Sequence, residues 1–330
     1  MKTNFKFKSV FFALFLLTFI VACDDDDSDN PVVQESTTIT ALAIADPNLS
    51  SLVAALTAAD GGLPSVLQGD GPFTVLAPTN EAFDAFLGDN SLEDIPTDVL
   101  TQVLLNHVIS GKIEAADLAA LTAEGSYYAS TLADGAKADT NMSIYFETEG
   151  AVTFNGISEV IDADIQASNG VIHKVDAVIT LPSVVDFALA DDRFSSLVTA
   201  LTADSSFEYV GALSTANGTA PAPFTVFAPT NDAFTALLTD LELTQLSEVP
   251  VATLQTVLEL HVVPSANVVS SELASLDGQA VATLGGSDIT ISASPAGIVG
   301  PGEDTTLNPI VIADVQASNG VIHAISRVIR

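Results

Sequence analysis

The sequence predicts an α+β fold that is built twice in tandem, and two observations carry this prediction. Two sequence blocks recur about 150 residues apart: Pro72–Phe83 reappears as Pro223–Phe234 with ten of twelve positions identical, and Asp164–His173 as Asp314–His323 with nine of ten identical. Between these blocks, each copy passes from helix-like apolar spacing to strand-like alternation. A repeat of this length is a globular domain and not a solenoid unit. The predicted domains are residues 37–181 and 183–330, joined at Leu181-Pro182.

Helices are predicted in the first half of each copy. Asn48–Ala59 places its leucines at helical spacing, and Arg193–Leu201 repeats the pattern. Asp98–Val108 reads as a further amphipathic helix, with Val99, Leu100, Val103 and Leu104 on its apolar side. These segments are expected to pack their apolar faces on the strands that follow.

A buried strand followed by a capped helix forms the first repeated block. Phe73–Ala77 is a short, apolar, β-prone run that stops at a proline. Thr79 or Asn80 then caps a short helix, because a side-chain oxygen at this position accepts a hydrogen bond from a free N–H of the first turn. The counterparts in the second copy are Thr230 and Asn231.

The second half of each copy is predicted to be rich in strands. Ser143–Phe154 and Ile157–Ala167 alternate like strands, and Val171–Ile179 is the returning strand. Asn169 and Gly170 favour a type I′ hairpin turn, because both residue types readily adopt positive φ. The counterparts in the second copy are Asn319 and Gly320.

The charge balance excludes nucleic acid as a partner. The chain has 42 Asp and Glu against 9 Lys and Arg, a formal net charge of −33. Three of the lysines lie in the first eight residues, so removal of that segment would leave 6 − 42 = −36. An acidic surface repels phosphate backbones, which proteins bind with Lys and Arg. With 48% hydrophobic residues and 17 Phe, the chain can nevertheless build folded cores.

The first 22 residues have the pattern of a secretory signal peptide, 1–22. Lysines precede Val10–Ala22, an almost unbroken apolar run of 13 residues that is too short to span a bilayer. Cys23, the only cysteine, follows directly and resembles the lipidated cysteine of a bacterial lipobox. The alternative is an ordinary signal peptide with a chance cysteine. We expect a lipoprotein held in the bacterial outer membrane by the lipid on Cys23 alone.

Residues 23–36 are predicted to be a solvated tether. Four adjacent aspartates, Asp24–Asp27, repel one another and cannot pack. The acidic run is either a plain spacer or, by its resemblance to the export signals of Bacteroidota lipoproteins, a signal for display on the cell surface. A flexible coil of this length averages about 20 Å, so the folded part is expected to stay close to its membrane.

The repeated blocks resemble the conserved motifs of the fasciclin (FAS1) domain. Pro72–Phe83 and Pro223–Phe234 are similar to the family's H1 motif, and Ala167–His173 and Ala317–His323 to its H2 motif. The resemblance covers essentially residues 37–330. It implies that each domain is a β-sandwich or wedge with helices packed around it.

A short element between the two motifs supports the same resemblance. His107 and His261 match the histidine of that element, although Leu260 replaces Asn106 ahead of the second histidine. The resemblance further implies extracellular adhesion or matrix binding. Because this module is reused widely, the resemblance indicates the fold far better than the ligand.

All four histidines of the chain lie in repeated elements. Metal ligation or general-base catalysis is one interpretation. Two histidines per domain are too few for a zinc site without carboxylates, and no HExxH pairing occurs. We favour structural histidines, with the His173 ring bonded to backbone or to a carboxylate such as Asp162 or Asp164. The four are His107, His173, His261 and His323.

No residue pattern supports an enzyme. Thr79 and Thr230 would need an adjacent base to act as nucleophiles, and helix capping explains both without one. The G-x-S-x-G elbow, the P-loop and the Rossmann fingerprint are absent. The acidic residues form no D-x-[DN]-x-[DN]-G loop, so we predict no cofactor and no metal site, with weak, diffuse cation binding left open.

The sequence therefore predicts a non-catalytic cell-surface lipoprotein that mediates adhesion through two tandem FAS1 domains. Its expected partners are extracellular matrix, a polysaccharide, a cell-surface protein or a second copy of itself. Two domains on one tether would add avidity towards a repetitive partner. The alternative is a periplasmic or surface accessory lipoprotein that captures a solute for a membrane partner, which predicts a concave pocket between the domains.

Overall fold

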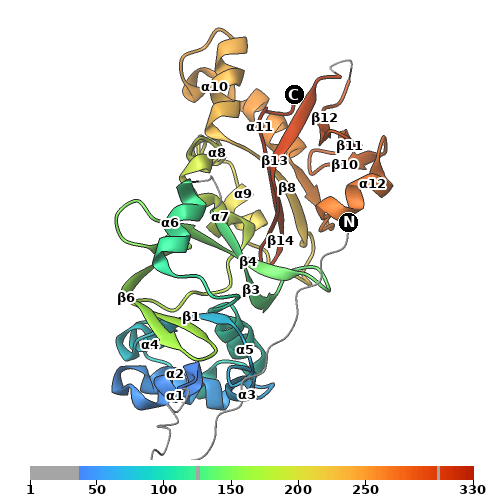
Figure 1. The fold of residues 1–330 in the computed structure, drawn as a ribbon. Coiled ribbons are helices and arrows are strands. Elements are labelled where there is room, and N and C mark those ends of the chain that lie inside the picture. Colours follow the sequence, from blue (N-terminus) through green and yellow to red (C-terminus); the bar gives the residue numbers. More distant parts are fainter. Residues whose placement is uncertain (1–36, 124–126, 303–304) are drawn as a thin grey trace, which may run out of the picture. The chain divides into compact units, whose positions relative to one another are not determined.

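A computed structural model describes residues 37–123, 127–302 and 305–330. The predicted signal peptide (1–22), Cys23 and the tether through residue 36 lie outside the described residues and stay predictions. Both repeats belong to one compact part of the chain. Each repeat combines strands and helices, so the α+β prediction is confirmed (Figure 1).

Among the described residues, the first repeat forms a closed barrel of seven strands, β1 to β7. The strand β1 (Phe73–Pro78) pairs in parallel with β7 (Gly170–Val175) and antiparallel with β2 (Val108–Ser110). Its residues from Thr74 onward are all buried, which explains why this segment reads as a continuous apolar run. The other strands are β3 (Tyr128–Asp134), β4 (Asn141–Glu147), β5 (Thr153–Phe154) and β6 (Ser158–Ala167).

Helices pack against this barrel and close its core. The helices α2 (Ser50–Ala58) and α5 (Thr97–Leu105) place Leu52 and Leu104 in one buried cluster with Val75 of β1. The remaining helical segments are α1 (Ile39–Ala45), η1 (Pro47–Leu49), α3 (Leu63–Val66), α4 (Asn80–Leu87), η2 (Leu92–Asp94) and α6 (Ala115–Ala123).

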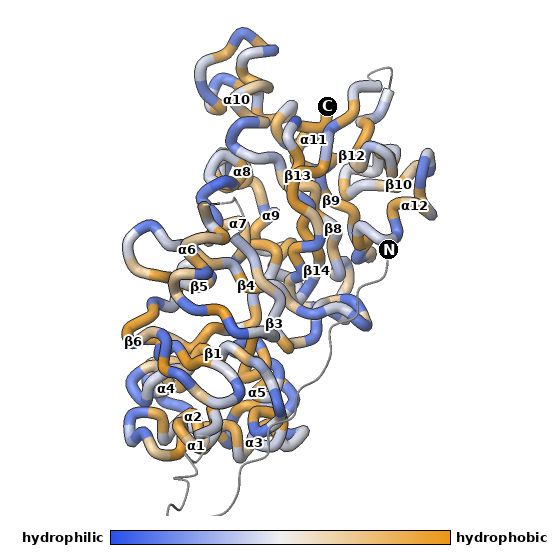
Figure 2. The backbone as a smooth tube through the Cα atoms, viewed as in Figure 1, coloured by the Kyte–Doolittle hydropathy of each residue, from blue (hydrophilic) through white to orange (hydrophobic). Residues whose placement is uncertain are grey.

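The second repeat follows the same plan, with β8 (Phe224–Pro229) in the place of β1. It pairs in parallel with β14 (Gly320–Ile325) and antiparallel with β9 (Val262–Pro264). The sheet order is β10-β11-β12-β13-β14-β8-β9, and Figure 2 shows a hydrophobic stretch along β13. The Leu284 N–H donates to the Val262 carbonyl over 2.7 Å, which links the two ends of this sheet. The other strands are β10 (Ala280–Ala282), β11 (Asp288–Ala293), β12 (Ala296–Val299) and β13 (Leu307–Gln316).

The helices of the second repeat enclose a phenylalanine-rich core. Phe187 of α7 (Val184–Ala190) and Phe234 of α10 (Asn231–Asp240) are buried in one cluster with Phe224 of β8. The remaining helical segments are η3 (Asp192–Phe194), α8 (Ser195–Leu201), α9 (Tyr209–Leu213), η4 (Leu246–Glu248), α11 (Val251–Leu260), η5 (Ser270–Glu272) and α12 (Leu273–Leu276).

The helix predicted over Asp98–Val108 is shorter than its pattern indicated. It ends at Leu105, and Val108 already belongs to β2. Val99, predicted on the apolar side, is 41% exposed. The other three residues predicted on that side, Leu100, Val103 and Leu104, are buried as expected.

Three predicted β features also differ from the structure. The single strand expected over Ser143–Phe154 is two strands, because the Glu147 carboxylate accepts hydrogen bonds from the next two backbone N–H groups and turns the chain. The strand expected over Val171–Ile179 ends at Val175. The type I′ turn is wrong, since positive φ occurs at Gly170 (155°) but not at Asn169.

The helices of the described residues are short relative to the thickness of a bilayer. Within the described ranges, no single helix is long and apolar enough to cross a membrane. Ile39–Ala45 and Pro47–Ala58 reach the required length only as a pair, and they are bent by 102° at their junction.

Candidate functional site

His107 closes the helix α5 and ties it to the chain beyond β7. Its Nδ1–H donates to the Val103 carbonyl over 2.7 Å, and its Nε2 accepts from the Ile179 N–H over 2.9 Å. These partners require the neutral tautomer with its proton on Nδ1. Burial lowers the pKa of His107 to about 4, so the ring is neutral at pH 7.

His261 takes the same place in the second repeat. Its Nδ1–H donates to the Val257 carbonyl over 2.6 Å, and its Nε2 accepts from the Ile329 N–H over 3.0 Å. Burial again lowers the pKa, to about 4. The preceding residue differs: the Asn106 amide donates to the Thr180 carbonyl, whereas Leu260 is buried in an apolar cluster. Since backbone groups occupy both nitrogens of both rings, this difference leaves the histidine contacts unchanged.

His173 on β7 is also bound by backbone on both ring nitrogens. Its Nε2–H donates to the Ile113 carbonyl over 2.9 Å, and its Nδ1 accepts from the Asp164 N–H over 3.2 Å. The nearest carboxylate oxygen of Asp164 lies 3.9 Å from Nδ1. The partner that sequence reasoning expected is therefore present, but through its backbone.

His323 repeats this arrangement on β14. Its Nε2–H donates to the Val268 carbonyl over 2.8 Å, and its Nδ1 accepts from the Asp314 N–H over 3.3 Å. Burial lowers the pKa of His323 as well. A buried neutral imidazole with both nitrogens occupied has no lone pair to offer a metal and no site for a substrate proton.

Asn169 fastens three parts of the first repeat. Its Oδ1 accepts from the Ile39 N–H at the start of α1 over 2.9 Å, and its amide donates to the carbonyls of Leu67 and Gly69 over 2.8 and 2.9 Å. In the second repeat, Asn319 makes the same bonds at 2.9, 2.7 and 2.9 Å. Its partners are Val184, Leu213 and Thr215.

Gly170 and Gly320 allow a close approach of two chain segments. A Cβ at Gly170 would lie 2.0 Å from the Phe73 carbonyl oxygen, and one at Gly320 would lie 2.4 Å from that of Phe224. No side chain fits at these distances, so both positions require glycine.

The Thr-Asn pair that follows β1 and β8 starts a helix in each repeat. The Thr79 side chain accepts from the Ala82 N–H, and the Asn80 side chain reaches sideways to the Ser51 N–H over 2.9 Å. These are capping and helix-joining bonds. Thr230 and Asn231 make the same contacts, with Ala233 and Ser196.

The twelve motif residues therefore hold each repeat together from within, and they do not converge on a shared site. Within the described ranges, no three His, Cys, Asp or Glu side chains are grouped so that they could hold a metal ion. The arrangement supports a rigid scaffold whose partners bind elsewhere on its surface.

Several clefts open on the surface of the described residues, and two of them differ clearly in chemistry. One of about 520 Å³ lies where the repeats meet, and it presents Asp60, Asp98 and Asp134 beside Asn217 and Ser318 of the second repeat. The other, of about 440 Å³, is mostly apolar. It lies between α10 and α11, lined by residues such as Leu237, Leu241, Val249 and Val257.

Sequence reasoning missed a cluster that joins the repeats. Tyr127, Tyr128 and Tyr145 of the first repeat pack against the core of the second, beside Asp191 and Arg193. The available signal was the crowding of three of the four tyrosines into residues 127–145. The surface that these rings pack on could not be predicted, because Asp191, the partner of Tyr128, lies 63 positions further along the chain.

The fold and the repeated hydrogen bonds define a pair of like domains, and comparison with known families gives their class. The fasciclin domain model matches residues 47–182 and 192–330. The chain therefore belongs to the fasciclin domain family, with two tandem FAS1 domains, each a seven-stranded wedge or barrel with helices.

Relatives occur in bacteria and in animals. Protein sll1483 of Synechocystis sp. is 37% identical over 181 residues, which cover 52% of this chain and 91% of that protein. Human periostin is 29% identical over 272 residues, covering 80% of this chain and 29% of periostin. A solved FAS1 domain pair from the insect cell adhesion molecule Fasciclin I has a TM-score of 0.52 and 20% identity, and the match covers 85% of this chain and 96% of that one.

Proposed function

We propose that this protein is a non-catalytic binding protein of the cell surface, which mediates adhesion or attaches extracellular matrix or polysaccharide through its two FAS1 domains. The observation that carries the proposal is that every motif residue forms contacts inside its own domain. The fold that these contacts hold together is shared with a cell adhesion molecule. The repeated motif residues build the scaffold, so binding falls to the exposed surfaces.

The charge of the surface points to the kind of partner. With 42 acidic and 9 basic residues, the chain attracts cationic groups, or anionic groups bridged by divalent ions. A cationic polysaccharide is therefore the first probe for adhesion.

The location is part of the proposal. Lipidation of Cys23 after removal of residues 1–22 would anchor the protein in the bacterial outer membrane, and the acidic tether of 23–36 would keep the domains near the cell surface. Protease shaving of intact cells, with a periplasmic protein as control, tests this: loss of both domains while the control survives supports surface display. Domains that survive on intact cells but are lost on lysis would contradict it.

Adhesion itself is tested with beads that carry the folded chain. We expect these beads to be retained by intact cells and by chitosan, a cationic polysaccharide, and not by neutral dextran. Retention on chitosan should fall as salt is raised, because exposed charges are screened beyond about 10 Å at 0.1 M. Beads that bind cells and chitosan no better than beads carrying an unrelated, equally acidic protein would refute the proposal.

The acidic cleft between the repeats favours a second candidate, capture of a cationic solute by a periplasmic or surface accessory lipoprotein. Asp60, Asp98 and Asp134 line the cleft beside residues of both domains. Changing these three to Asn should weaken spermidine binding at least tenfold in calorimetry. The charge-matched control changes the exposed Asp84, Asp89 and Asp232 to Asn. An equal loss of spermidine affinity in both variants would mean that the cation is attracted by the overall negative charge and not by the cleft.

A further inference from the structure

The contact between the two domains comes largely from one hairpin of the first domain. β4 lies against β13 of the second domain, and the loop that connects β3 with β4 contacts the chain just beyond β13. Two backbone contacts run along this line. The Ala136 N–H donates to the Ala317 carbonyl over 3.1 Å, and the Gln316 N–H donates to the Ser143 hydroxyl over 3.0 Å.

At the base of the hairpin, aromatic side chains pack against an ion pair whose carboxylate is buried and whose guanidinium is partly exposed. Asp191 has a fully buried carboxylate, and the Arg193 guanidinium meets it at 2.6 Å. The Tyr128 hydroxyl donates to the same carboxylate over 2.8 Å from the other domain, and the Tyr127 ring centre lies 4.3 Å from Arg193 Cζ. Burial together with the Asp191 carboxylate raises the pKa of Tyr128 well above its ordinary value, so the hydroxyl keeps the proton that it donates.

Through these contacts, the stability of the second domain depends on the first. A buried carboxylate is costly unless its oxygens are hydrogen-bonded. Here one of the donors, the Tyr128 hydroxyl, comes from the first domain, and the Tyr127 ring of the same domain lies against the Arg193 guanidinium. If the domains separated, Asp191 would lose that donor and Arg193 would lose that ring contact.

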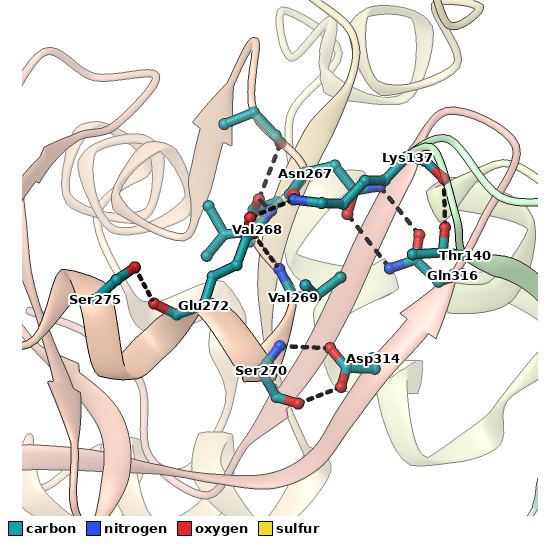
Figure 3. A network of polar contacts seen from close by, with 12 residues as sticks. Lys137, Thr140, Asn267, Val268, Val269, Ser270, Glu272, Ser275, Asp314 and Gln316 are labelled. Carbon is teal, nitrogen blue, oxygen red and sulfur yellow. Dashed lines mark hydrogen bonds and ion pairs between the residues drawn. The ribbon is translucent and has the colours of Figure 1, made fainter.

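At the tip of the hairpin, a polar network completes the contact (Figure 3). The Lys137 ammonium donates to the Asn267 carbonyl over 3.1 Å and lies 2.6 Å from the Glu272 carboxylate. The Asn267 amide donates to the Gln316 side chain over 3.0 Å. The Lys137–Glu272 pair is partly exposed and contributes little by itself. Its place at the far end of the hairpin gives the contact a second point of attachment.

The internal repeat supplies a natural comparison. Tyr128 faces Tyr145 across β3 and β4, and the corresponding cross-strand pair of the second domain is Ala280 with Thr290. The second domain therefore lacks the aromatic side chains at the hairpin positions where the first domain has them.

The surface of the second domain that contacts the hairpin has no counterpart in the first domain either. The counterpart of Asp191 is Asp46, 145 positions earlier, and it is held within its own domain by Lys174 at 2.7 Å. The counterpart of Arg193 is Asn48. Both halves of the contact are thus present only where domain 1 meets domain 2, since neither half recurs at the counterpart positions of the other domain.

We propose that the β3–β4 hairpin is a dedicated clamp that couples the two domains into one cooperative unit in a set order. A partner that engages both domains would then meet two sites at one spacing, and not two modules on a free linker. This inference concerns the coupling of the domains and stands apart from the identity of any ligand.

The test compares two double variants of the full folded chain. Tyr127→Ser with Lys137→Ser removes one contact at each end of the clamp. Tyr209→Ser with Lys112→Ser removes the same residue types where their partners, Glu259 and Glu114, lie in the same domain. Urea unfolding is followed by far-UV circular dichroism and by tyrosine fluorescence, which reports mainly the clamp because three of the four tyrosines lie there.

The unaltered chain and the control variant should each unfold in one transition, with the same midpoint by both probes. In the clamp variant the transition should split in two, and amide hydrogen exchange at Ala136 and Gln316, whose N–H groups donate across the contact, should become at least tenfold faster. If that variant fails to fold, Tyr128→Phe removes only the hydroxyl on Asp191 and should show the faster exchange by itself. The proposal is overturned by an unaltered chain that unfolds in two steps, or by clamp variants whose transition and exchange match those of the control.

Discussion

A histidine that is held neutral in the folded chain gains a proton when the chain unfolds in mild acid. The pKa values of His107 and His261 are lowered by burial from 6.5 to about 4. Between these values the unfolded state binds more protons than the folded state, so stability is complete above about pH 6.5 and is lost as pH falls towards 4. The loss is on the order of 3 kcal/mol for each histidine.

Urea unfolding at pH 7, 6 and 5 measures this dependence. The free energy of unfolding should fall below pH 6.5, and His261→Gln should reduce the slope by about 1.4 kcal/mol per pH unit relative to the unaltered chain. Values at pH 7 and 8 serve as the control, since neither form titrates there. An unchanged slope between pH 6 and 5 would mean that this ring is not the acid-sensitive group.

Glycine at position 170 is the sharpest steric requirement in the chain. Gly170→Ala would place a Cβ 2.0 Å from the Phe73 carbonyl oxygen, so β7 would have to move away from β1. We expect a loss of more than about 3 kcal/mol in urea unfolding. Gly211→Ala is the control, because its Cβ meets open space within α9 and should stabilise by about 0.5–1 kcal/mol. Similar effects in the two variants would argue against the close approach.

At the scale of elements, the first repeated block was predicted well and the hairpin turn was not. The strand and capped helix around Thr79 depend on local signals: an apolar run, a proline and a capping side chain. The turn at Asn169 depends on Ile39 and Leu67, which are 130 and 102 positions away. Such long-range hydrogen bonds outweigh the local preference of Asn-Gly for positive φ, and no window of sequence around the turn contains them.

The variant Asn169→Asp tests whether these long-range hydrogen bonds hold the turn. The carboxylate retains the acceptor for Ile39 but cannot donate to the Leu67 and Gly69 carbonyls, and a buried charge would face those oxygens. The expected loss is roughly 2–5 kcal/mol in urea unfolding. Asn90→Asp is the matched control at an exposed amide and should cost less than about 0.5 kcal/mol. A near-neutral Asn169→Asp would show that this amide does not fasten the loop.

At the scale of the whole molecule, the acidic excess repels itself. With 42 acidic against 9 basic residues, salt should stabilise the folded chain by screening that repulsion. Melting followed by circular dichroism should give a midpoint several degrees higher in 0.5 M than in 10 mM NaCl. KCl, as the control for a specific ion effect, should act equally. A midpoint that stays constant or falls with salt would contradict this account.

The two-domain organisation, the α+β class and the family could all be predicted from the sequence alone. These follow from near-identical repeats, from periodicity and from short motifs, all of which are local or self-similar. The sequence also placed the four histidines in structural roles, since too few ligands accompany them. The positions of the motif side chains could be listed in advance, but not their individual partners.

Only the tertiary structure decided which surfaces meet. The clamp joins Tyr128 to Asp191 across 63 positions, and its counterparts Ala280 and Asp46 show that neither half can be inferred from the repeat. This is because the free energy that a buried carboxylate or an aromatic ring contributes to folding depends on the groups that surround it. That enclosure is created by the packing of one domain on the other.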